Sequence, residues 1–106
     1  NLQANALKIG DYLKDGLEKL KAKHNVIGDV RGKGLMLGIE FVKDRATKEP
    51  AKAECAQVFE TARDLGLLVG KGGFHANVIR LTPPMSITQA DADFILPVFD
   101  AALSAL

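Results

Sequence analysis

Hydrophobic residues recur every three or four positions along the first part of the chain. This spacing places them on one face of a helix: Leu2, Ala6, Ile9, Leu13, Leu17 and Leu20. Two glycines, Gly10 and Gly16, lie within the same segment, and each weakens a helix by about 1 kcal/mol relative to alanine. The pattern therefore predicts a helix over residues 2–23 that is held in place by tertiary packing.

A different period follows. From residue 35 to residue 42, every second residue is a large apolar one: Leu35, Leu37, Ile39 and Phe41. A period of two predicts a strand. Residues 26–31 form a second strand-like run, and Gly32-Lys33-Gly34 lies between the two. A glycine pair in that position is typical of a hairpin turn. Gly38, inside the second strand, suggests a close approach by another backbone.

The middle of the chain predicts a loop, a helix and a short strand. Residues 43–50 are polar, and we expect them to form the longest loop. Residues 51–64 have helical spacing, and Gly66 stands where a helix C-cap glycine belongs. Residues 67–69 then read as a short buried strand. The glycine-rich residues 70–73 read as a turn or flexible loop.

The last third predicts one more strand and one more helix. Residues 78–81 form an apolar run that Pro83-Pro84 ends. Thr88 and Asp91 are spaced as a variant of the capping box, so a helix begins there. Pro97 lies inside this helix, and we expect it to kink or break the helix.

The predicted order of elements is α-β-β-α-β-β-α. Hairpins combined with helices indicate an α+β fold. We expect a small antiparallel or mixed sheet of three to four strands, with the helices packed on one of its faces.

Composition narrows the classes of partner. The chain has 106 residues, 47% hydrophobic and 25% charged, which fits a single globular domain over residues 1–106. Fourteen basic and thirteen acidic residues leave a net charge of +1, which argues against nucleic acid or an anionic membrane as a partner. No apolar run approaches the roughly 18 residues of a membrane-spanning helix.

Most candidates for chemistry have an ordinary structural explanation. Cys55 is the only cysteine, which excludes a disulfide framework and a multi-cysteine metal site; on the apolar side of a helix it is inert core. His24 and His75 lie far apart in the sequence and do not have the spacing of metal ligands. We therefore predict neither a metal site nor a catalytic histidine. Residues 28–36 suggest an anion nest, but a tight hairpin with Arg31 as a surface or ion-pairing residue is favoured.

Arg80 is the stronger candidate for a binding residue. Strand alternation places Ile79 and Leu81 on one face of the sheet and Val78 and Arg80 on the other. A guanidinium there can bind a carboxylate through two parallel hydrogen bonds. From the residues alone, a solvated arginine and a structural ion pair remain alternatives.

Several motifs together resemble a known family. The run G-D-V-R-G-K-G-L-M-L-G-I-E over residues 28–40, G-L-L-V over 66–69, I-R-L-T-P-P over 79–84 and the helix opened by Thr88 occur in order. Together they resemble the C-terminal small domain of class III aminotransferases, which are pyridoxal-phosphate enzymes of fold type I. The branch most similar is that of the type 2 alanine–glyoxylate aminotransferases.

The resemblance implies specific roles. In such enzymes the arginine of R-x-x-P-P binds the substrate carboxylate, which corresponds to Arg80. The large domain binds pyridoxal phosphate and supplies the Schiff-base lysine. Neither Lys33 nor Lys71 matches that motif, so no residue here is expected to be catalytic or cofactor-binding. The implied reaction transfers an amino group from an amino acid or amine to a 2-oxo acid such as pyruvate or glyoxylate.

The resemblance also implies partners. They are the large domain of the same polypeptide, the amino acid and 2-oxo acid substrates, and a second copy in a homodimer. The chain starts at Asn1 rather than Met, a hint of a fragment that we expect to be inactive alone. The compartment is open between a bacterial cytoplasm and a mitochondrial matrix. The alternative is a free-standing α+β module that binds a small ligand or regulates a partner.

Overall fold

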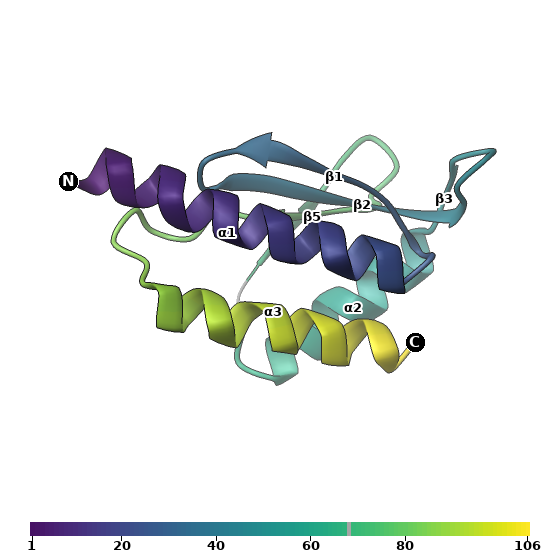
Figure 1. Ribbon diagram of the computed structural model, residues 1–106. Helices are drawn as coiled ribbons and strands as arrows, with labels where there is room; N and C mark the ends of the chain where they lie inside the picture. Colours follow the sequence, from purple (N-terminus) through teal and green to yellow (C-terminus); the bar gives the residue numbers. More distant parts are fainter. Residues whose placement is uncertain (68) are drawn as a thin grey trace.

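A computed structural model describes residues 1–67 and 69–106. These residues form three helices on one antiparallel sheet of five strands (Figure 1). In chain order the elements are α1 (Leu2–Lys23), β1 (Ile27–Lys33), β2 (Met36–Asp44), β3 (Glu49–Pro50), α2 (Lys52–Asp64), β4 (Gly70–Gly72), β5 (Val78–Leu81) and α3 (Gln89–Ser104). The α+β fold and the antiparallel sheet predicted from the sequence are confirmed.

The strands run in the order β1-β2-β5-β4, and β3 pairs with the far end of β2. Two strands lie where loops were expected. The polar residues 43–50 contain β3, and the glycine-rich residues 70–73 contain β4, which pairs with β5. A strand was also expected at residues 67–69. This prediction is wrong for Leu67 and Val69, which lie outside any strand, and Leu68 lies outside the described residues. Glycine-rich residues have low strand propensity, so the sequence gives no local signal for β4. The strand forms because β5 supplies partners for its backbone hydrogen bonds.

The core lies between the sheet and the helices. Side chains of β2 and β5 that point to this side are buried at 0–2% exposure, together with the inner faces of all three helices: Leu37, Ile39, Phe41, Ile79 and Leu81. Figure 1 shows α1 and α3 side by side in front of the sheet. Leu2 departs from the predicted stripe, since it is 59% exposed at the open end of α1.

The two glycines of α1 are sites of close packing. A Cβ on Gly10 would lie 2.2 Å from the carbonyl oxygen of Gly34, in the hairpin turn. A Cβ on Gly16 would lie 2.4 Å from a methyl carbon of Leu96, on α3. The low helix propensity of glycine is therefore offset by the approach of α1 to its neighbours.

The predicted hairpin is confirmed, but its turn lies two residues later. Lys33 pairs with Met36, so Gly34 and Leu35 form the turn. Gly34 has φ +58°, which suits a two-residue hairpin turn. Leu35, expected as a strand residue, is buried from within the turn.

Both helix-end signals are confirmed. After α2, Gly66 has φ +94°, its N–H donates to Arg63, and the Leu67 N–H donates to Ala62, which is a Schellman arrangement. At α3, Thr88 and Asp91 form a reciprocal capping box. Of the kink or break expected at Pro97, the break is wrong, because α3 continues through this residue, and the kink stays a prediction. Buried side chains on both sides of Pro97 hold the helix to the core.

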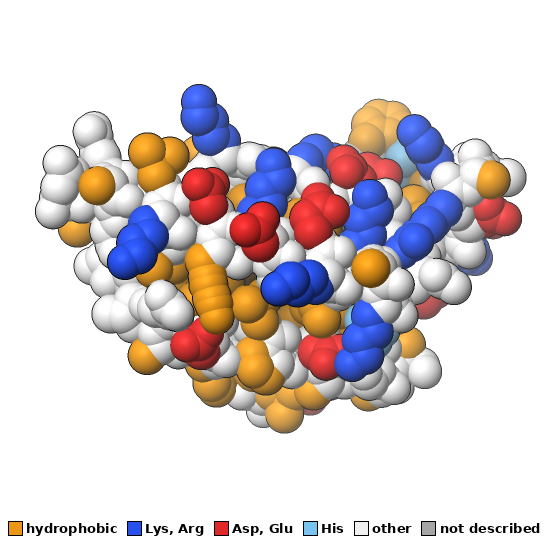
Figure 2. All heavy atoms as spheres, in the orientation of Figure 1, with side chains coloured by type: hydrophobic (Ala, Val, Ile, Leu, Met, Phe, Trp, Pro, Cys, Tyr) orange, Lys and Arg blue, Asp and Glu red, His pale blue; other side chains and the backbone are white. Residues whose placement is uncertain are grey.

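The outward face of α1 carries many charged side chains (Figure 2). Figure 2 shows basic and acidic side chains spread over α1, with apolar side chains gathered below it towards α3. Within the described part of the chain, no helix has the length and apolar character needed to cross a bilayer.

Candidate carboxylate-binding site

Arg80 lies on the sheet face that the helices leave open. Ile79 and Leu81 are buried beneath the helices, while Arg80 between them is exposed. Val78 shares the face of Arg80 and is buried outside the main core cluster. The strand parity expected for β5 is confirmed.

Glycines surround Arg80 on both neighbouring strands. Its cross-strand partners are Gly38 on β2 and Gly70 on β4. A Cβ on Gly72 would lie 2.8 Å from Cζ and 2.9 Å from Nη2 of Arg80, so the guanidinium rests on Gly72. Sequence reasoning missed Gly72, because the signal is the pairing of β4 with β5. The close backbone approach expected at Gly38 is wrong, since the atom nearest to a Cβ there is a Val78 methyl at 3.6 Å.

These residues border a shallow hollow of about 320 Å³. Its lining comes from β1, β2, β5 and the segments that follow β4 and β5: Arg31, Gly32, Met36, Leu37, Gly38, Gly73, Val78, Arg80 and Thr82. Within the described residues, three arginines have side-chain hydrogen bonds or ion pairs: Arg31, Arg45 and Arg63. The Arg80 guanidinium has none with these residues. An arginine without a protein partner retains its full set of donors for an anion.

The second arginine of the hollow is already paired. Arg31 Nη1 donates to Asp29 Oδ2 and to Glu40 Oε1, both at 3.1 Å. The hydrogen bond to Asp29, followed by that to Glu40, raises the pKa of Arg31 above its ordinary value. The ion-pairing interpretation of Arg31 is confirmed, and it is not the open cation of this face.

The described residues do not fit pyridoxal phosphate. Lys71 pairs with Ile79 and so faces the helices, with its Nζ 5.3 Å from the ring centroid of Phe59. Lys33 is exposed at the end of β1. Among the described residues that line the Arg80 hollow there is neither a lysine nor an acid, so this hollow does not fit the cofactor.

The histidines have structural surroundings. His24 Nε2 lies 2.7 Å from Asp100 Oδ1, and Lys23 Nζ lies 2.9 Å from Oδ2, which ties the end of α1 to α3. The hydrogen bonds from His24 and then Lys23 hold the pKa of Asp100 below its usual value. His75 packs edge-on against Phe74. The described residues contain no cluster of three or more potential metal ligands.

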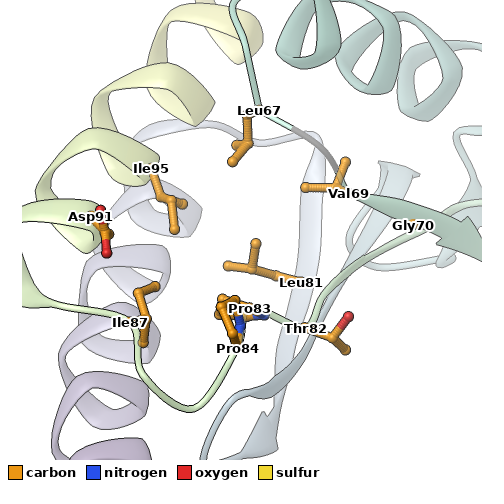
Figure 3. A pocket seen from close by; sticks show the side chains of 10 residues that line it. All are labelled: Leu67, Val69, Gly70, Leu81, Thr82, Pro83, Pro84, Ile87, Asp91 and Ile95. Atoms are coloured by element: carbon orange, nitrogen blue, oxygen red, sulfur yellow. The ribbon is translucent and has the colours of Figure 1, made fainter.

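A second hollow of about 470 Å³ is apolar and lies on the helix side. Figure 3 shows Leu67, Leu81, Ile87 and Ile95 directed towards it, with Pro83 and Pro84 at its edge. Its one charged lining residue among those described is Asp91, which is engaged in the α3 cap. This hollow suits an apolar group and holds no cation for a carboxylate.

Cys55 is predicted to be unreactive. It is fully buried, and burial raises the pKa of its thiol from 9.0 to about 11, with a smaller opposing effect of Lys71. Because the thiolate is the nucleophile, two pH units reduce the reactive fraction at pH 8 about 100-fold. We expect iodoacetamide to label native Cys55 at least that much more slowly than the urea-unfolded chain. Equal labelling rates, followed by mass spectrometry, would contradict this.

Comparisons with known proteins identify the family of the chain. The Aminotransferase class-III family model matches residues 1–103. The chain is 52% identical over 103 residues to the mitochondrial alanine–glyoxylate aminotransferase 2 homolog 2 of Arabidopsis thaliana, covering 97% of the chain and 22% of that protein. It is 47% identical over 110 residues to the taurine–pyruvate aminotransferase of Bilophila wadsworthia, covering 98% of the chain and 24% of that protein.

Solved structures of transaminases have the same fold as this chain. An amine transaminase from an uncultivated Pseudomonas species, solved with pyridoxal phosphate bound, superposes with a TM-score of 0.89 at 34% identity. The match covers 98% of this chain and 23% of that one. The chain thus spans between a fifth and a quarter of the length of each of these three proteins. By sequence and by fold, the chain belongs to the class III aminotransferase family.

Proposed function

We propose that this chain is the C-terminal small domain, residues 1–106, of a longer aminotransferase and that Arg80 binds the substrate carboxylate. One observation carries the proposal: the Arg80 guanidinium is exposed on the open sheet face and has no partner among the described residues. Gly72 makes room for the guanidinium, and Gly38, its cross-strand neighbour, adds no side chain beside it. Two parallel hydrogen bonds to a carboxylate would set the direction in which the reacting carbon points.

The substrate class follows from what the relatives are named for. One is named for alanine and glyoxylate and the other for taurine and pyruvate. Glyoxylate and pyruvate are both 2-oxo acids with one carboxylate, whereas the donors end in a carboxylate or a sulfonate. We therefore assign Arg80 to the anionic group that an amino acid donor and the 2-oxo acid acceptor share, in transfer of an amino group from an amino acid or amine to a 2-oxo acid; with an amine donor, Arg80 would bind the acceptor alone.

The rest of the active site belongs to the large domain of the same polypeptide. That domain holds pyridoxal phosphate, which acts as the electron sink of amino transfer, and the whole enzyme is a homodimer. On this proposal the isolated chain does not transaminate. Its own contribution is to bind and orient the substrate.

Two glycine variants of the full-length enzyme test the role of Arg80. A Cβ at Gly72 would displace the guanidinium, whereas a Cβ at Gly70 would lie 3.6 Å from Arg80 Cβ, an ordinary contact. Losing one charged hydrogen bond costs about 1.5 kcal/mol, so Gly72→Ala should raise the KM for pyruvate or glyoxylate about 10-fold. Gly70→Ala should stay within about 2-fold, since surface changes are usually small.

Steady-state kinetics with both acceptors provide the measurement, and thermal unfolding confirms that both variants fold. A wild-type enzyme that transfers no amino group to any 2-oxo acid would refute the proposed reaction. Equal KM values for Gly72→Ala and Gly70→Ala would leave the reaction standing but remove Arg80 from it.

A further inference from the structure

A row of residues crosses the open face of the sheet. Arg31 on β1 pairs with Gly38 on β2, and Gly38 pairs with Arg80 on β5. Directly opposed residues point to the same face, so the two arginines stand on either side of a glycine. Strands lie about 4.8 Å apart, which places their Cα atoms about 10 Å from each other.

Glu40 stands on this same face, within reach of either arginine. It lies two residues from Gly38 on β2 and pairs with Val78, which lies two residues from Arg80 on β5. Glu40 and Arg80 are therefore diagonal neighbours, a relation of about 7–8 Å that long side chains can span. Glu40 nevertheless accepts a hydrogen bond from Arg31 Nη1 at 3.1 Å.

Arg31 lines two hollows, of which only one has carboxylates among its described lining residues. The Arg80 hollow has no acidic lining residue among those described. The other hollow that Arg31 lines, of about 490 Å³, contains Asp29 and Glu40. Arg45, which also lines the second hollow, donates to backbone carbonyls of Lys21, His24 and Ile27. Arg31 is therefore the arginine that holds these carboxylates.

We infer that Arg31 is a positioning residue that keeps Glu40 from neutralising Arg80. The inference rests on the proposed function, because it assumes that Arg80 must be free to bind the substrate carboxylate. Without Arg31, Glu40 loses its cation and can turn to Arg80 along the diagonal. The substrate carboxylate then competes with a carboxylate of the protein itself. Arg31 thus acts on substrate binding through Glu40.

The test uses the full-length enzyme with single and double variants of Arg31 and Glu40. Exposed ion pairs contribute about 0.2–1 kcal/mol, so Arg31→Met should raise the KM for the 2-oxo acid about 1.4- to 5-fold. The turnover number should not change, because binding to the ground state and to the transition state is weakened equally. The double variant Arg31→Met/Glu40→Gln should return the KM to that of Glu40→Gln alone. Arg31→Lys, which keeps a cation beside Glu40, should remain near the wild-type KM.

The rescue separates positioning from a general structural effect. A KM that rises in Arg31→Met and stays raised in the double variant would overturn the inference, as would an unchanged KM in Arg31→Met. Arg31→Lys keeps the question answerable if Arg31→Met does not fold, since Glu40→Gln in that background should then have no effect on KM. Arg80→Lys separates a failure of this inference from a failure of the proposed function. If Arg80→Lys strongly lowers kcat/KM but Arg31→Met leaves the KM unchanged, only the role of Arg31 is refuted. If Arg80→Lys leaves kcat/KM unchanged, the assignment of Arg80 to the substrate carboxylate is refuted.

Discussion

We expect Arg80→Lys in the full-length enzyme to lower kcat/KM about 10- to 150-fold for the amino donor and the keto acceptor alike. Lysine keeps the charge but lacks the planar pair of donors that matches a carboxylate. One hydrogen bond to a charged group contributes about 1.5–3 kcal/mol, and that range converts to the stated loss. Steady-state kinetics with both substrates provide the measurement.

The rest of the enzyme should be unaffected by this change. Arg80 is exposed and lies on the face opposite the main core, so the unfolding temperature and the cofactor absorbance should stay near those of the wild type. Arg63→Lys is the matched control, because Arg63 is an exposed arginine on α2 that pairs with Glu60. The Arg80 assignment fails if the two variants have equal kcat/KM.

The second large effect concerns stability. Gly10→Ala should lower the free energy of unfolding by about 2 kcal/mol, whereas Gly16→Ala should change it by less than about 1 kcal/mol. Both substitutions gain about 1 kcal/mol of helix propensity. At Gly10 the new methyl meets the backbone carbonyl of Gly34 at 2.2 Å, and at Gly16 it meets the flexible end of Leu96. A backbone in a tight turn cannot move away as a leucine side chain can, so overpacking costs more at Gly10.

Urea unfolding followed by circular dichroism measures both variants on one scale. The order of the two midpoints is the decisive result. A Gly10→Ala protein as stable as Gly16→Ala would mean that α1 does not rest on the hairpin turn. Gly34→Ala is unsuitable as a partner variant, because its φ of +58° adds strain of its own.

Local signals were sufficient for much of the fold. The spacing of Ile9, Leu13 and Leu17 follows the helix period, and these side chains are buried where α1 meets the sheet. The caps at Gly66 and Thr88 depend on residues within a few positions of each other. Each of these features is decided by neighbours along the chain, so periodicity and capping chemistry predict it. The alternation that set Arg80 apart from Ile79 and Leu81 is of the same kind.

Long-range pairing decided what local signals left out. Glycines 70 and 72 have low strand propensity, and β4 exists because β5 offers it backbone partners. That pairing places Gly72 under the Arg80 guanidinium. The pairing of Arg31 with Glu40 was open in the sequence, because Glu40 reaches Arg31 only once β1 and β2 are in register, whereas Asp29 lies two residues away on the same strand.

The continuity of α3 through Pro97 has the same origin. Proline removes one helical hydrogen bond, which favours a break in an isolated helix. Ile95, Val98 and Phe99 are buried in the core, and their burial outweighs that local cost. The sequence alone therefore determined the helices, their ends and the side of β5 on which Arg80 stands. Only the tertiary structure decided the surroundings of Arg80, because contacts between strands distant in sequence depend on register and have no local signature.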